Sequence, residues 1–293
     1  MVVSEFFVYF IIYSFLGWIY ETCYCTIVEK SWQNRGFLYG PVVPMYGLAA
    51  VACHIIFIRL PYESLHNMKW YYLFLICAAG SFVMEYVTSF ILEKKFHARW
   101  WDYSNIPLNI NGRVALPFTF CFGCAGVVIV NYLLPFVNRL NSCVHPLVFE
   151  ILGLALMLIF GMDLALTISN LTSFAKEFER INDSINLQMS ERIESIGNTV
   201  VETKESISEV KENIELSLLE RKEAKALKRE QNEERYEELR EQISIEAIKK
   251  YLANASESQK GQLRHIVSFR HPVASTKKLM EKGSAILKKK ISK

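Results

Sequence analysis

The sequence predicts an all-α membrane protein: a bundle of about five transmembrane helices followed by a long cytoplasmic helix or coiled coil. Two observations lead to this prediction. Hydrophobic residues make up 51% of the chain and charged residues 22%, and the two kinds are segregated, with apolar segments first and a charged stretch after them. In addition, each apolar segment is close to the ~20 residues that cross a bilayer as a helix.

Five apolar segments are expected to span the membrane. They are Phe6–Val28, Gly40–Leu60, Trp70–Leu92, Ala115–Val137 and Val144–Leu166. The first segment has no basic region before it and is too long for a cleavable signal peptide, so we expect it to remain as an anchor. The chain has seven cysteines, and an odd number placed mostly within such segments argues against a disulfide framework.

Lysine and arginine in the short connections indicate the orientation, because cytoplasmic loops carry more of them. With the N-terminus outside, the inner connections carry Lys30, Arg35, Lys94, Lys95, Arg99 and Arg113, whereas the outer ones carry Arg59, Lys69 and Arg139. We therefore expect a multi-pass protein of the cell membrane with its C-terminus in the cytoplasm. This orientation also places the connections 31–40 and 93–113 on the same face.

The connection from Glu93 to Arg113 combines charged groups with large aromatic rings. Tryptophan and tyrosine settle at the membrane–water boundary, where a ring and a polar group are both accommodated. We interpret this connection as a segment in the interface, folded back over a polar site. Its candidate binding residues are Arg99, Trp101, Asp102, Tyr103, Asn109 and Arg113. An aromatic belt with basic anchors is the alternative, and it explains the same residue types without a function.

Further candidate binding residues lie in two apolar segments and in the connection between the first two. Glu85, Thr88 and Ser89 share one helix face by their spacing. A carboxylate at that depth costs about 2–3 kcal/mol on insertion scales, so we expect Glu85 to face a cavity or a cationic partner, and Glu21 lies at a comparable depth. Asn34 and Arg35 belong to a connection rich in Gly and Pro, which is also consistent with a tight turn and a snorkelling arginine.

The chain divides into three parts by composition: a transmembrane domain over 1–170, a charged coiled-coil helix over 171–250 and a basic tail over 251–293. Apolar residues recur at spacings of three and four from Met189 to Leu218, which predicts a coiled coil and a homo-oligomer through residues 181–218. The basic tail either approaches anionic lipid or stays solvated. Charge alone does not indicate nucleic-acid binding, and none is expected.

Several separated motifs resemble one bacterial family. They are Gly17–Glu21, Asn34–Pro41, Glu85–Ser89, Arg99–Ser104 and Asn109–Arg113, and they resemble the ABC transporter permeases of the CmpB type over roughly residues 5–140. The resemblance implies a multi-pass membrane protein and, through the family name, transport. The chain has no GxxxxGK[ST] loop, so an ATPase would have to be a separate subunit. The fragment Glu223–Ala226 lacks the glycine of the usual docking loop.

Three functions stay open at this point. The first is a permease-like protein for a small polar or anionic solute, with a charged cavity on the cytoplasmic side. The second is an intramembrane enzyme acting on a lipid or lipid-linked headgroup, using buried carboxylates as acid or base and arginine to bind phosphate. The third is a membrane-anchored coiled-coil scaffold. No catalytic residue, metal site or cofactor is predicted, and the lipid bilayer is the expected surrounding.

Overall fold

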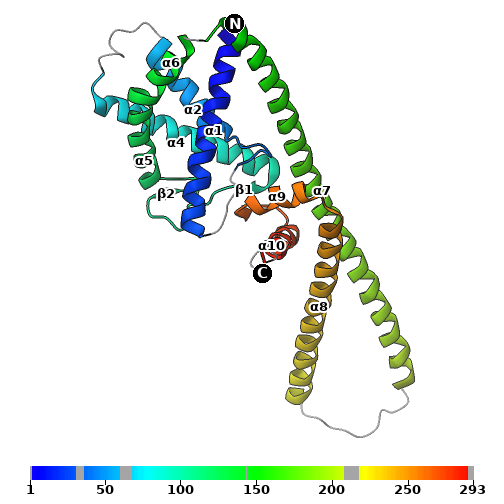
Figure 1. Ribbon diagram of the computed structural model, residues 1–293. Coiled ribbons are helices and arrows are strands. Elements are labelled where there is room, and N and C mark those ends of the chain that lie inside the picture. The colour runs from blue at the N-terminus through cyan, green and yellow to red at the C-terminus, as the bar shows by residue number, and fades with distance from the viewer. Residues whose placement is uncertain (1, 31–35, 60–67, 143, 208–217, 290–293) are drawn as a thin grey trace. The chain divides into compact units, whose positions relative to one another are not determined.

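The computed structural model describes residues 2–30, 36–59, 68–142, 144–207 and 218–289, and it is helical over most of its length (Figure 1). The chain forms two compact units. The first comprises Met1–Ser173 and Glu257–Pro272, and the second comprises Phe174–Ser256 and Val273–Lys293. The helix α7 (Pro146–Ile207) contributes to both units.

The first unit contains the apolar helices. These are α1 (Val2–Glu29), α2 (Pro44–His54), α4 (Trp70–Phe96), α5 (Leu116–Val128), α6 (Leu134–Ser142) and the first part of α7, with π-helical turns η1 (Ile55–Arg59) and η2 (Ile129–Leu133). Within the described ranges, four stretches are long and apolar enough to cross a membrane: Val3–Val28, Trp70–Phe96, Leu116–Leu140 and Pro146–Arg192. The predicted all-α membrane fold is confirmed.

The second predicted span differs from the other four. Its helical part, Pro44–Phe57, belongs to the shorter apolar helices and rises only about 21 Å, less than the ~30 Å hydrocarbon core of a bilayer. The stretch before it, which includes Gly40 and Pro41, forms bends instead of helix, because proline cannot donate to a helical ladder and restricts the residue before it. Pro44 then occupies the first turn of α2, where a missing N–H costs nothing.

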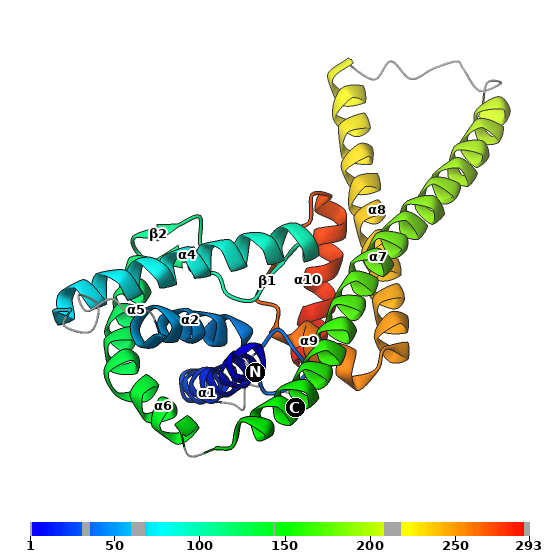
Figure 2. The same ribbon diagram turned by 90° about the horizontal axis from the view of Figure 1, so that it is seen from above.

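Helix α2 runs antiparallel to α1. Near its start, the backbone N–H of Val43 donates to the carbonyl of Ser14 at 3.0 Å, and near its end the ring of His54 stacks on Tyr9 with centroids 4.8 Å apart. Helix α4 follows α2 in the sequence and again runs in the direction of α1. Helix α2 therefore runs in the opposite direction to the two helices on either side of it. Figure 2 shows α2 between α1 and α4, with α5 and α6 beside them.

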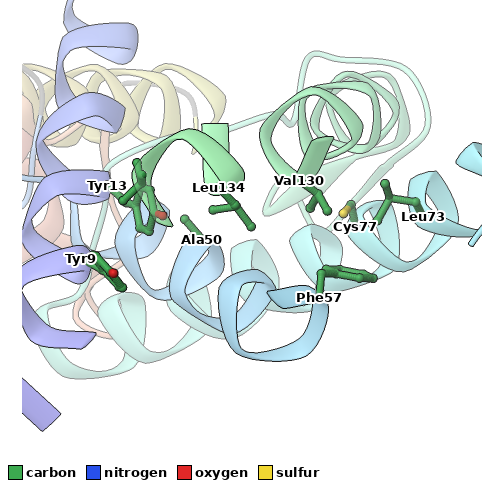
Figure 3. Close-up of a cluster of buried hydrophobic side chains, with 9 residues drawn as sticks. Tyr9, Tyr13, Ala50, Phe57, Leu73, Cys77, Val130 and Leu134 are labelled. Carbon is green, nitrogen blue, oxygen red and sulfur yellow. The ribbon is translucent and has the colours of Figure 1, made fainter. Parts of the chain in front are cut away.

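Small residues allow the helices to approach closely. A Cβ on Gly47 of α2 would lie 2.5 Å from the carbonyl oxygen of Phe10, and one on Gly123 of α5 would lie 2.6 Å from the Phe74 ring. Such contacts are typical of helix packing in membranes, where van der Waals contact replaces the hydrophobic effect. The apolar helices and their π-helical turns form a buried hydrophobic core, shown in Figure 3, which consists of Tyr9, Tyr13, Ala50, Phe57, Leu73, Cys77, Val130, Leu134 and Val137.

Short strands close one end of the first unit. β2 (Asn109–Ile110) and β3 (Val114–Ala115) form a hairpin. β1 (Ala98–Arg99) pairs antiparallel with β4 (Ser268–Phe269), so that Arg99 lies opposite Ser268. Because β4 follows α9 (Glu257–His265), a segment from near the end of the chain completes the first unit.

The second unit consists of the remainder of α7, α8 (Leu218–Asn254) and α10 (Ala274–Lys289). The ring of Phe178 meets the Tyr251 ring at 5.4 Å, and Ile185 and Met189 are buried. Part of the apolar repeat that predicts a coiled coil is therefore covered within one chain. The segment 208–217 lies outside the described residues, and pairing with a second copy stays a prediction. The stretch predicted as a basic tail contains α9, β4 and α10.

Candidate functional site

The connection after α4 folds into a compact loop because particular residues adopt left-handed backbone conformations. His97, with φ of 52°, ends α4, and its N–H donates to the carbonyl of Glu93. Asn111 and Gly112, with φ of 53° and 67°, turn the β2–β3 hairpin, as expected for an Asn-Gly pair. A Cβ on Gly112 would lie 2.6 Å from Asp102 Oδ1, so the loop packs tightly around this turn.

Glu93 holds two arginines at the base of this loop. Arg99 Nε donates to one of its carboxylate oxygens, and Arg113 Nη2 lies 3.1 Å from the other. The guanidinium of Arg113 also lies over the rings of Tyr86 and Phe90, at 5.4 and 5.2 Å from their centroids. Charge-assisted pairs of this kind are among the stronger hydrogen bonds in proteins. Both arginines therefore fasten the loop to α4.

The carboxylate of Asp102 accepts hydrogen bonds from two distant parts of the chain. Its Oδ1 accepts from the backbone N–H and hydroxyl of Ser104, and its Oδ2 accepts from Ser268 Oγ and Arg270 Nη2, each at 3.1 Å. Burial alone would raise the pKa of Asp102, but these hydrogen bonds together lower it below its usual value. The carboxylate is thus charged at neutral pH and ties the loop to β4.

Beside this network lies a cavity of about 150 Å³. Its lining includes the aromatic residues Phe37, Tyr46, Trp100, Trp101, Tyr103 and Phe122 together with aliphatic ones. Its polar lining includes Glu21, Glu85, Thr88 and His265. The side chains come from α1, α2, α4, α5, α9 and the two connections at this end of the first unit, so the cavity exists only when these elements are assembled.

Glu85 is the most deeply buried acid of this lining, with 3% of its surface exposed. The hydroxyl of Tyr103 donates to Glu85 Oε1 at 3.3 Å, whereas Oε2 has no hydrogen-bond partner among the described residues. The Tyr103 ring stacks on Phe118 at 4.7 Å. Burial and the neighbouring Glu85 raise the pKa of Tyr103, so its hydroxyl stays protonated and remains a donor.

The structure distributes the predicted site residues between the cavity and the loop network. Glu21, Glu85, Thr88, Trp101 and Tyr103 line the cavity. Arg99, Asp102 and Arg113 lie in the network instead, and Asn109 supports the turn by accepting from the N–H of Gly112 at 3.0 Å. Ser89 is buried on α4. Asn34 and Arg35 lie outside the described residues.

Other residues of the site were not predicted from the sequence. Phe37, Tyr46 and Phe122 look like ordinary lipid-facing or packing aromatics until the fold places them in one wall. His265, Ser268 and Arg270 lie far along the chain, and no local pattern connects them with the loop.

Asp163 also acquires an unexpected role. It accepts from the backbone N–H groups of Tyr39 and Gly40 at 3.0 and 2.8 Å. It thereby holds the connection that supplies Phe37, which the sequence alone does not indicate.

No group of three or more His, Cys, Asp or Glu residues is arranged for a metal ion in the part of the chain that the structure describes.

Comparison with known proteins agrees with the motifs. The family model described as "Putative ABC-transporter type IV" (ABC_trans_CmpB) matches residues 8–168, more than half of the chain. No curated protein and no solved structure matches the chain. The matched region includes the loop after α4 and most of the cavity, and the segment that carries His265 and Arg270 lies beyond it. The resemblance predicted from the motifs is confirmed, and the chain belongs to this ABC-transporter type IV family of membrane proteins.

Proposed function

We propose that this protein is a permease-like membrane protein that binds a small polar solute in the cavity beside the loop after α4. The observation that carries the proposal is the buried Glu85 carboxylate, which lines an aromatic cavity while one of its oxygens has no hydrogen-bond partner in the described part of the chain. A buried oxygen in that state costs about 1–3 kcal/mol. A bound solute would satisfy it.

The excess of lysine and arginine in the connections near this cavity supports a cytoplasmic position for it. The chain would then lie in the cell membrane with its N-terminus outside and its C-terminus in the cytoplasm. The family assignment supports a separate ATPase subunit as a partner. Oligomer formation through residues 181–218 and the scaffold role stay predictions of the sequence.

The contacts of the arginines bear on the choice between permease and lipid enzyme. A phosphate-binding enzyme site would use the guanidinium groups of Arg99 and Arg113, but Glu93 already engages both. The carboxylates of Glu21 and Glu85 line the cavity instead. This arrangement favours a neutral or cationic solute over an anionic solute or headgroup.

Two measurements test the proposed function. Full-length protein in nanodiscs should show a raised melting temperature with at least one solute from a panel of small polar compounds, and Glu85→Gln should abolish that shift. Chemical cross-linking in native membranes should recover a protein that carries a nucleotide-binding GxxxxGK[ST] loop. If no solute shifts the melting temperature and no nucleotide-binding partner is recovered, the permease-like function is wrong.

A further inference from the structure

The wall of the cavity has a composition that points to a class of solute. Six aromatic side chains contribute to it: Phe37, Tyr46, Trp100, Trp101, Tyr103 and Phe122. They come from separate segments, the connection before α2, α2 itself, the loop after α4 and α5. An aromatic ring presents a negative face, and cages of such rings recognise ammonium groups, above all quaternary ones.

The charge of the lining agrees with a positively charged solute. Glu21 and Glu85 both line the cavity, and none of the described lining residues is a lysine or arginine. The two arginines of the loop, Arg99 and Arg113, are already paired with Glu93. Because a buried carboxylate requires a compensating charge or hydrogen bond, the open oxygen of Glu85 calls for a cation or a donor brought by the ligand.

The size of the cavity suits a small organic molecule. A space of about 150 Å³ is as large as a cavity that holds benzene in another protein. It therefore suits a molecule of about six or seven non-hydrogen atoms.

We propose that the solute of this cavity is a small organic cation carrying a substituted ammonium group, held by the aromatic side chains and by the carboxylate of Glu85. The inference rests on the proposed function, since it names the class of solute for that same cavity. The ammonium group lies against the rings near Glu85. A hydroxyl or other polar end of the molecule faces Thr88 or His265, which line the same space.

The test compares choline with its neutral carbon analogue, 3,3-dimethyl-1-butanol, which has nearly the same shape without the charge. Both are titrated by calorimetry into full-length protein in nanodiscs. Choline should bind at least about tenfold more tightly than the neutral analogue, as expected for a desolvated cation against aromatic faces and a carboxylate. Acetate, which has the opposite charge, should not bind.

Two variants locate the effect. Glu85→Gln should reduce the preference for choline over the neutral analogue by about tenfold or more, whereas the control Glu177→Gln, an exposed acid on α7, should leave it unchanged. Tyr46→Leu leaves the charge of the cavity unchanged and removes one aromatic ring. It should weaken the binding of choline more than the binding of the neutral analogue. The readout is a ratio within one preparation, so a partly unfolded sample does not change it.

The outcomes separate this inference from the proposed function. Equal affinity for choline and its analogue overturns the organic cation and leaves solute binding standing. The same conclusion follows if an anionic or uncharged solute binds in a Glu85-dependent way while choline does not. If no solute of any charge binds, both the inference and the proposed function are overturned.

Discussion

At the scale of single residues, Glu93 determines how the loop after α4 is attached. It faces Arg99 and Arg113, whose side chains are 7% and 12% exposed. Removing one partner from a buried ion pair leaves the other charge without compensation, and this costs more than the pair contributes. Both arginines therefore depend on Glu93, although Arg99 also lies 3.6 Å from Asp102 Oδ1.

We expect Glu93→Gln to lower the free energy of unfolding by about 3 kcal/mol, because Arg113 loses its carboxylate partner and Arg99 keeps only the longer contact with Asp102 at 3.6 Å. Thermal unfolding in nanodiscs, followed by circular dichroism, measures the effect. Glu177→Gln is the matched control, since Glu177 pairs with Arg180 at the surface, where the arginine side chain is 78% exposed and such pairs contribute at most about 1 kcal/mol. Equal effects of the two substitutions would contradict this account.

Asp102 should make the attachment of the loop sensitive to acid. Its pKa is lower in the folded protein than the ordinary 3.8, so its contribution to stability is complete above the unfolded pKa and is lost as the pH falls through the folded one. The difference in stability between the native protein and Asp102→Asn should therefore shrink below about pH 4. Urea unfolding at a series of pH values tests this, and a constant difference would refute it.

At the scale of elements, a crowded glycine on α2 tests how closely α1 and α2 pack, and an uncrowded glycine on α4 is its control. A Cβ on Gly47 would meet the Phe10 backbone and ring, whereas one on Gly80 of α4 would meet nothing within 4 Å. We expect Gly47→Ala to destabilise the protein by about 1–3 kcal/mol through overpacking. Gly80→Ala should be neutral or stabilising by up to about 1 kcal/mol, because alanine favours a helix. Melting temperatures of both variants decide the point.

The strand pair β1–β4 should protect the loop from local opening. The N–H of Val267 donates to the carbonyl of Arg99 at 2.8 Å, and that of Arg270 donates to His97 at 2.7 Å. Val267→Pro removes the first donor, so the amide of Arg270 should exchange with deuterium about tenfold faster, which corresponds to ~1.4 kcal/mol. Val267→Ala keeps the N–H and is the control. An unchanged exchange rate of the Arg270 amide in the proline variant would show that the β1–β4 pair contributes little to the local stability of the loop.

At the scale of the whole molecule, the direction of the helices bears on membrane topology. Helix α2 lies between α1 and α4 and is shorter than the other apolar helices, so the predicted topology of five passes depends on whether α2 crosses the membrane. We expect reporter fusions to place the N-terminus outside and the C-terminus in the cytoplasm. Termini found on the same side would mean that α2 does not cross.

Much of the first unit is predictable from local sequence. Apolar segments of membrane-spanning length predict their helices directly, because burying that many apolar side chains in a bilayer does not depend on which other helix lies beside them. The same reasoning singles out Glu21 and Glu85, since a carboxylate within such a segment requires a polar surrounding. The loop residues Trp101 and Tyr103 were identified by type and position, and both line the cavity.

Only the tertiary structure shows which charges are already paired with one another. The sequence places Arg99, Asp102 and Arg113 near the site by type, but their partners Glu93, Ser268 and Arg270 depend on a hairpin turn and on a strand contributed from far along the chain. Contacts of that kind depend on the packing of whole elements, for which no local pattern exists. The sequence by itself therefore determined the membrane helices and the presence of buried acids, whereas tertiary packing decided that, in the part of the chain that the structure describes, aromatic rings and carboxylates line the cavity and arginines do not.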